Sequence, residues 1–139
     1  MKLTWLGHSG FRLQIEQAVI LIDPWFSGNP VFPDDRRAEA IDCATHILIT
    51  HGHGDHTGDT LALAKELKIP VVGIFDLIGH WEKTDKIEGI GFNKGGTVDL
   101  GGARVTIGAF VVMVASTGVL VISTLLDTAG ATTWCAARR

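Results

Sequence analysis

Short apolar segments separated by turn residues dominate the first part of the chain. Residues 2–6, Phe11–Ile15 and Ala18–Ile22 are rich in the residue types that favour β-strands. The separators are brief, because 7–10 is a glycine-containing turn and only Glu16 and Gln17 stand between the second and third segments. Such closely spaced strands predict an antiparallel meander rather than the start of a doubly wound α/β sheet.

Beyond residue 22 the pattern alternates between short strands and helices. Residues 45–50 form an apolar run typical of a buried strand, and this run ends directly at His51. Residues 59–67 are predicted to form a helix because Leu61, Ala64 and Leu67 recur every third residue. The remaining expected elements are a strand at 71–74, a short helix from 76 to about 82, and strands near 97–99 and 104–107.

Composition narrows the class of protein. A chain of 139 residues forms one domain at most, and its 46% apolar content supports a packed core. The net charge of −3 and the lack of a long Lys/Arg run argue against nucleic-acid binding. The first residues lack the apolar stretch of a secretory signal, and Cys43 and Cys135 match neither a CxxC zinc motif nor a disulfide framework. We therefore expect a cytoplasmic protein that does not bind nucleic acid.

One uncharged run allows a second interpretation. Residues 105–126 contain no charged side chain, and about 20 apolar residues suffice for a bilayer-spanning helix. The run is rich in Val, Ile and Thr, and Ser116, Thr117 and Gly118 interrupt it where a turn would fall. We therefore favour a buried hairpin without a membrane partner, with membrane attachment as the alternative.

The clearest chemical feature is the sequence His-Gly-His-Gly-Asp-His at residues 51–56. Imidazole nitrogens and a carboxylate suit zinc, iron or manganese, and the absence of cysteine argues against a structural zinc finger. In an extended start His51 and His53 point to the same side, and the two glycines let the chain bend so that Asp55 and His56 turn toward a second position. Such a loop can serve two cations about 3.5–4 Å apart that make hydroxide available near neutral pH.

This His-x-His-x-Asp-His pattern resembles the signature of the metallo-β-lactamase superfamily. Four further segments resemble those of metal-dependent hydrolases related to ascorbate-6-phosphate lactonase. They are residues 5–11 (Trp-Leu-Gly-His-Ser-Gly-Phe), 20–24, 93–97 and 101–106. The resemblance covers residues 1–107 and implies an α+β fold, an αββα sandwich of which the chain carries the N-terminal half. Residues 108–139 form a divergent apolar tail, explained either by a frameshift or truncation, which we favour, or by a short divergent family member.

The resemblance also implies roles for individual residues. His51 and His53 would bind one divalent metal, with zinc expected first and manganese or iron as alternatives. Asp55 and His56 would bind the second metal, and Asp55 would also orient the nucleophilic water. Asp23 either supports a metal ligand or is a turn-forming residue before Pro24. His8 either contacts the substrate or a ligand, or is a structural histidine in a glycine-rich turn.

The implied activity is hydrolysis of a small-molecule ester, lactone or phosphate-containing substrate by metal-bound hydroxide. Complete family members take further metal ligands from their second half, whereas this sequence has no histidine after His80. Asp127-Thr128 only faintly resembles the family's metal-bridging motif, so we assign it no role. The alternative is therefore a metal-binding fragment with weak or no catalysis. Half of a sandwich would also expose sheet faces, which favours association into a homo-oligomer.

Overall fold

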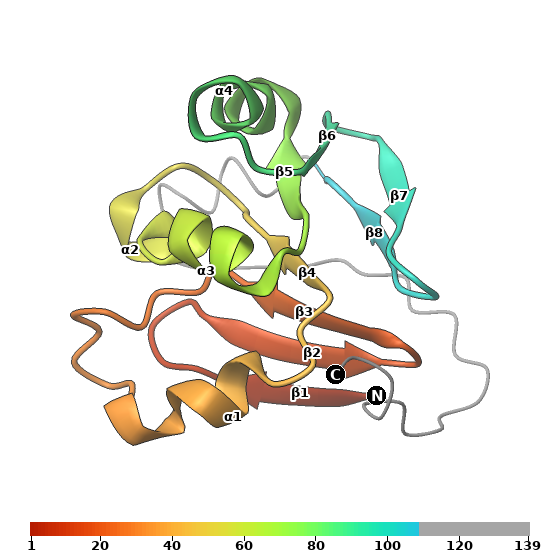
Figure 1. Cartoon of the computed structure of the whole chain (residues 1–139). Helices are drawn as coiled ribbons and strands as arrows, with labels where there is room; N and C mark the ends of the chain where they lie inside the picture. The colour runs from red at the N-terminus through yellow and green to blue at the C-terminus, as the bar shows by residue number, and fades with distance from the viewer. Residues whose placement is uncertain (109–139) are drawn as a thin grey trace.

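The computed structural model of the chain describes residues 1–108, which form one mixed sheet with helices on one side and a small hairpin on the other (Figure 1). The main sheet has the spatial order β1 (Lys2–Trp5), β2 (Phe11–Ile15), β3 (Ala18–Ile22), β4 (His46–Leu48), β5 (Val71–Ile74) and β6 (Gly89–Phe92). The hairpin consists of β7 (Thr97–Asp99) and β8 (Arg104–Thr106). The helical segments are η1 (Asp34–Arg36), α1 (Arg37–Ile41), α2 (Gly54–Thr57), α3 (Thr60–Leu67) and α4 (Phe75–Asp85).

The strand directions divide the sheet into two parts. β1, β2 and β3 pair antiparallel, which confirms the predicted meander. β3, β4, β5 and β6 then pair in parallel, and β4, β5 and β6 are each reached through helical segments on one face of the sheet. The carboxyl ends of β3, β4 and β5 therefore meet at one edge of the sheet, where the loops that follow them come together.

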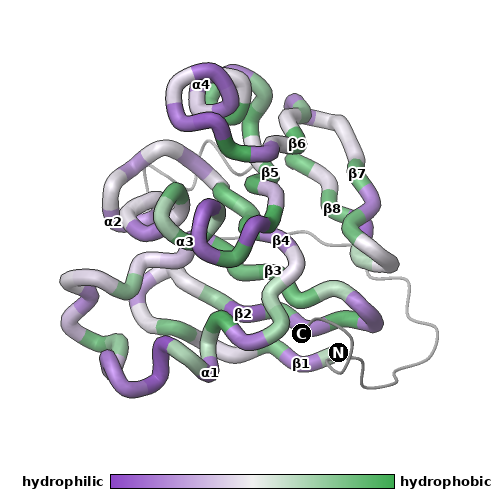
Figure 2. The backbone as a smooth tube through the Cα atoms, viewed as in Figure 1, coloured by the Kyte–Doolittle hydropathy of each residue, from purple (hydrophilic) through white to green (hydrophobic). Residues whose placement is uncertain are grey.

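The core lies on both faces of the central strands, because successive side chains of a strand point to opposite sides. On the helix side, Leu21 and Ile47 pack with Leu63 of α3 and Ile78 of α4. On the hairpin side the packed residues are Ile20, Ile22, Leu48, Val72, Leu100, Ala103 and Val105. Figure 2 shows hydrophobic residues concentrated along these strands. This two-sided burial explains why every residue of β3 is apolar.

The structure corrects several element predictions. α2 begins at Gly54, inside a segment that we expected to be a loop, and α4 continues to Asp85 rather than ending near residue 82. The short helix α1 was not predicted, because charged residues surround Ala40, its single buried residue. Strand β6 was not predicted because Gly89 and Gly91 are poor strand formers.

Some sequence predictions concern residues outside the described part of the chain. These are the apolar tail (108–139) apart from its first residue, most of the uncharged run (105–126), Asp127-Thr128 and Cys135. Within residues 1–108, none of the helices has the length and apolar character needed to cross a bilayer.

Candidate metal centre

The predicted site residues lie at the sheet edge where the parallel strands end. Asp23 directly follows β3, and Thr50 and His51 follow β4 by two and three residues. β3 and β4 are parallel neighbours, so their carboxyl ends bring Asp23 beside Thr50. The chain then turns into α2, with His53 at the N-cap and Asp55 in the first turn.

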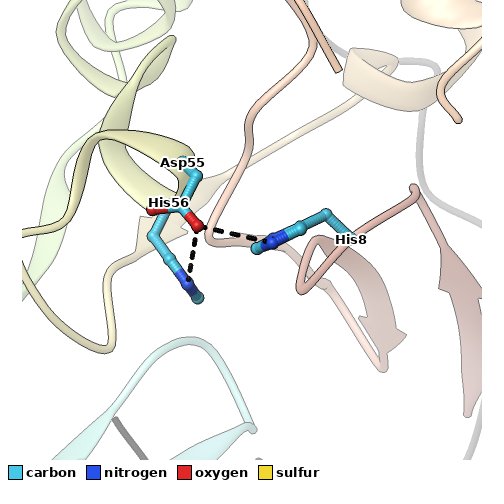
Figure 3. A group of neighbouring side chains, drawn as sticks. All are labelled: His8, Asp55 and His56. Atoms are coloured by element: carbon cyan, nitrogen blue, oxygen red, sulfur yellow. Dashed lines mark ion pairs between the residues drawn. The ribbon is translucent and has the colours of Figure 1, made fainter. Parts of the chain in front are cut away.

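The four motif side chains converge, and His8 joins them from the loop between β1 and β2. The ring centroid of His51 lies 4.5 Å from that of His53 and 4.0 Å from that of His56. Asp55 Oδ2 lies 3.9 Å from His56 Nε2 and 3.4 Å from His8 Nε2 (Figure 3). Five potential ligands from two distant segments thus face a common region.

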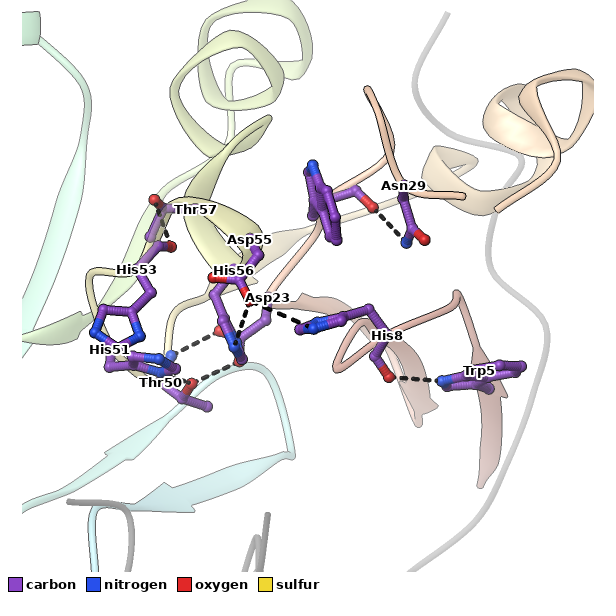
Figure 4. Close-up of polar contacts among 11 residues, drawn as sticks. Trp5, His8, Asp23, Asn29, Thr50, His51, His53, Asp55, His56 and Thr57 are labelled. Atoms are coloured by element: carbon purple, nitrogen blue, oxygen red, sulfur yellow. Dashed lines mark hydrogen bonds and ion pairs between the residues drawn. The ribbon is translucent and has the colours of Figure 1, made fainter. Parts of the chain in front are cut away.

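Asp23 is the fully buried anchor of this cluster. Its Oδ1 accepts a hydrogen bond from the backbone N–H of Thr50 at 2.8 Å. Its Oδ2 accepts from the Thr50 hydroxyl at 2.5 Å and lies 2.9 Å from His56 Nδ1 (Figure 4). Asp23 also has a left-handed backbone, with φ of 45°, a conformation that Asp tolerates better than most residues. The carboxylate therefore links the end of β3 to both the end of β4 and helix α2.

These contacts assign the tautomers of two histidines in their neutral form. The Thr50 hydroxyl donates its only hydrogen to Asp23, so its oxygen can only accept from His51 Nδ1, 3.0 Å away. His56 Nδ1 likewise donates to the Asp23 carboxylate. Both rings therefore keep a lone pair on Nε2, which is the form that binds a metal.

The two histidines respond differently to their surroundings. Burial lowers the pKa of His56, but the hydrogen bond and charge of Asp23 and the charge of Asp55 outweigh it, so the pKa is raised overall. The pKa of His51 is lowered, first by burial and then by the neighbouring His56, against the opposing charges of Asp23 and Asp55. The two carboxylates thus favour positive charge on the His56 ring.

A second buried carboxylate holds the neighbouring loop in place. Asp59 Oδ2 accepts from the backbone N–H groups of Phe26 at 2.6 Å and Ser27 at 2.9 Å, and Oδ1 accepts from the Ser27 hydroxyl at 2.6 Å. Trp25 in this loop packs against Gly58, and its ring meets the His8 ring edge-on at 5.3 Å. The loop therefore connects α2 and α3 to His8.

The roles of Thr50, Trp25 and Asp59 at the site were not predicted from the sequence. The available signals were a polar residue directly before the motif and the turn-rich composition of 23–30. The other two histidines lie elsewhere: His46 is in β4 with Nδ1 2.9 Å from Thr45 Oγ1, and His80 is exposed on α4.

A fold of this topology with such a cluster at its strand ends defines a metallo-β-lactamase-like protein, and the comparisons with known proteins agree. The sequence model of the beta-lactamase superfamily domain matches residues 2–120, so the chain belongs to this superfamily. A protein of Paracoccus denitrificans named "UPF0173 metal-dependent hydrolase" is 80% identical over 106 residues, which are 76% of this chain and 46% of the relative. A protein of the same name from Dinoroseobacter shibae is 62% identical over the same shares. The chain spans about half the length of the curated relatives it matches.

Solved structures give the same result. Igni18, a metallo hydrolase from Ignicoccus hospitalis, aligns with a TM-score of 0.64 and 30% identity over 76% of this chain and 47% of its own. The metallo-beta-lactamase SMB-1 aligns with a TM-score of 0.56 and 22% identity over 77% of this chain and 50% of its own, which supports the fold alone. The predicted family and the metallo-β-lactamase-like fold class are confirmed.

Proposed function

We propose that the protein is a hydrolase that uses divalent cations at the 51–56 cluster to cleave a small-molecule ester, lactone or phosphate-containing substrate. The observation that carries this proposal is the convergence of the motif side chains around the Asp23 network, with Nε2 of His51 and His56 free to coordinate. The names of the curated relatives, all metal-dependent hydrolases, support the same class of activity.

The donor set fits a divalent cation. His51 and His53 would hold one cation and Asp55 and His56 a second, with Asp23 orienting His56 through Nδ1. Nitrogen and carboxylate donors suit zinc first, and manganese or iron as alternatives. A cation in this place would lower the pKa of a coordinated water and polarise a carbonyl or phosphoryl oxygen of the substrate.

The protein side chains would position the reacting groups. Asp55 is 45% exposed, so its carboxylate can both face the cluster and accept a hydrogen bond from an incoming water. Asp23 is fully buried and touches only Thr50 and His56 among the polar partners described above, so its role is to orient them. The buried Asp23 carboxylate would therefore orient neighbouring side chains, and the exposed Asp55 carboxylate would act at the reaction site.

One observation favours a second candidate, a metal-binding protein with weak catalysis. A catalytic zinc is usually held by three protein ligands and a water, whereas the motif supplies two residues for each of two cations.

Turnover by the metal-loaded chain separates the two candidates. The purified chain would be loaded with zinc, manganese or iron(II) and assayed with lactone, carboxylate-ester and phosphoester substrates. We expect hydrolysis that EDTA abolishes and that His53→Ala reduces at least a hundredfold, while His80→Ala, which removes an exposed imidazole on α4, leaves it unchanged. Stoichiometric metal binding without turnover of any substrate would favour the weakly catalytic alternative.

A further inference from the structure

His8 lies where a third ligand to the cation at Asp55 and His56 would be. His8, Asp55 and His56 each offer one ligand atom, and these atoms all lie within 4.8 Å of one another. Figure 3 shows the His8 ring and the His56 ring pointing to the same carboxylate oxygen of Asp55. Two imidazoles and one carboxylate around a common point form a donor set typical of zinc.

One donor–donor distance matches tetrahedral coordination, and the others are longer. With ligands at about 2.0–2.1 Å from zinc, neighbouring donor atoms of a tetrahedral site lie about 3.3 Å apart. His8 Nε2 and Asp55 Oδ2 are 3.4 Å apart, close to that value. His56 Nε2 and Asp55 Oδ2 are 3.9 Å apart, and all three ligand atoms lie within 4.8 Å of one another, so side-chain rotations would have to draw the donors closer around a cation.

A tight turn and two tryptophan contacts hold the loop around His8. His8 has a φ of 48°, in the left-handed region that histidine, like aspartate, tolerates better than most residues, and Gly7 before it has a φ of 85°. Trp5 Nε1 donates a hydrogen bond to the His8 carbonyl at 2.9 Å, and Trp25 contacts the ring edge-on. These contacts hold the His8 ring beside Asp55 and His56.

We propose that His8 is a ligand of the cation bound by Asp55 and His56, so that this position has three protein ligands and one open place for water or substrate. The inference rests on the proposed function, because it requires a cation at this end of the cluster. It adds a ligand from the β1–β2 loop, a segment that the 51–56 motif does not include.

Zinc titration of the 139-residue chain by calorimetry tests this assignment. His8→Gly removes the imidazole while accommodating the left-handed backbone, and His8→Gln keeps a hydrogen-bond donor toward Asp55 without an imidazole. We expect both variants to lose at least tenfold in affinity at one binding event and to keep the other within about twofold, with His80→Ala unchanged as the control. Cobalt(II) in place of zinc should show an altered visible absorption spectrum in both His8 variants, because the spectrum reports the ligand set.

The outcomes separate this inference from the proposed function. Wild-type affinity and spectrum in both His8 variants would overturn the ligand role while leaving the metal centre intact. Recovery of full affinity by His8→Gln alone would also overturn it, because a hydrogen bond to Asp55 would then be sufficient. Failure of the wild-type chain to bind zinc or cobalt at all would overturn both proposals. Circular dichroism of the metal-free variants verifies that each is folded.

Discussion

Replacing Asp23 with Asn changes the charge and one acceptor of the buried anchor while keeping its shape. In the wild type, Asp23 Oδ1 accepts from the Thr50 N–H, and Oδ2 contacts the Thr50 hydroxyl and His56 Nδ1. An amide has one acceptor oxygen and one NH2 donor group, so it cannot accept at both positions.

Both orientations of the new amide are unfavourable. If its NH2 group replaces Oδ1, it faces the Thr50 N–H, and a buried donor is left without an acceptor at a cost of about 1–3 kcal/mol. If the NH2 group replaces Oδ2, the Thr50 hydroxyl can rotate to accept, but His56 must move its proton from Nδ1 to Nε2 and so loses its metal-binding lone pair. Loss of such a partner typically lowers metal affinity about 10–100-fold, or about 1.4–2.7 kcal/mol.

Urea unfolding in EDTA measures the loss of stability from the unpaired buried donor. Competition with a chelator measures the loss of zinc affinity from the altered His56. Asp59→Asn is the matched control, because Asp59 is also buried and accepts three hydrogen bonds but contacts none of the histidines. Its amide can keep the oxygen toward the two backbone N–H groups and turn its NH2 group toward the Ser27 hydroxyl, which can rotate to accept. We expect Asp23→Asn to weaken zinc binding and Asp59→Asn to leave it within about threefold. Equal zinc affinity in Asp23→Asn and the wild type would refute the orienting role of Asp23.

Three further outcomes are expected. Gly58→Ala should lower the free energy of unfolding in urea by about 1–3 kcal/mol, because its Cβ would lie 2.9 Å from the Gly54 carbonyl oxygen and 3.0 Å from Trp25 Cδ1. Gly54→Ala is the control and should change little, because its Cβ would have no atom within 4 Å. Equal losses in the two variants would contradict the close contact at Gly58. Ile47→Ala should lower the free energy of unfolding by about 2–5 kcal/mol, because Ile47 is fully buried. Leu3→Ala on the exposed edge strand should lower it by about 0.5 kcal/mol or less. A similar loss in both variants would argue against the described core. EDTA should lower the Tm of the zinc-loaded chain, since zinc at 100 times its Kd stabilises the fold by about 2.7 kcal/mol, and an unchanged Tm would count against a folded-state metal site.

Features set by local sequence were predictable. The three antiparallel strands follow from short β-rich runs and brief turns, and α3 follows from its apolar spacing. The 51–56 motif was found for the same reason, because all of its potential ligands lie within one continuous segment. The prediction that this motif follows a buried strand is also confirmed, because the motif comes after β4.

Features that depend on long-range packing were not settled by the sequence. His8 and Asp23 each had two open interpretations, because only the sheet order places the loops after β1 and β3 beside α2. Strand β6 was missed because Gly89 and Gly91 disfavour strands, yet a side chain at either position would crowd α4, so glycine permits the close packing. The role of Asp59 was hidden because its carboxylate binds residues far away in the sequence rather than capping its own helix.

An anomalous difference map from crystals of the zinc-loaded chain, recorded at the zinc absorption edge, tests the metal centre most directly. We predict peaks among His51, His53, Asp55 and His56, with ligand atoms at about 2.0–2.2 Å, Nε2 of His51 and His56 as donors, and Asp23 outside the coordination sphere. Zinc bound in solution and in the crystal, but with its peaks elsewhere on the molecule, would contradict the assignment of this cluster as the metal site.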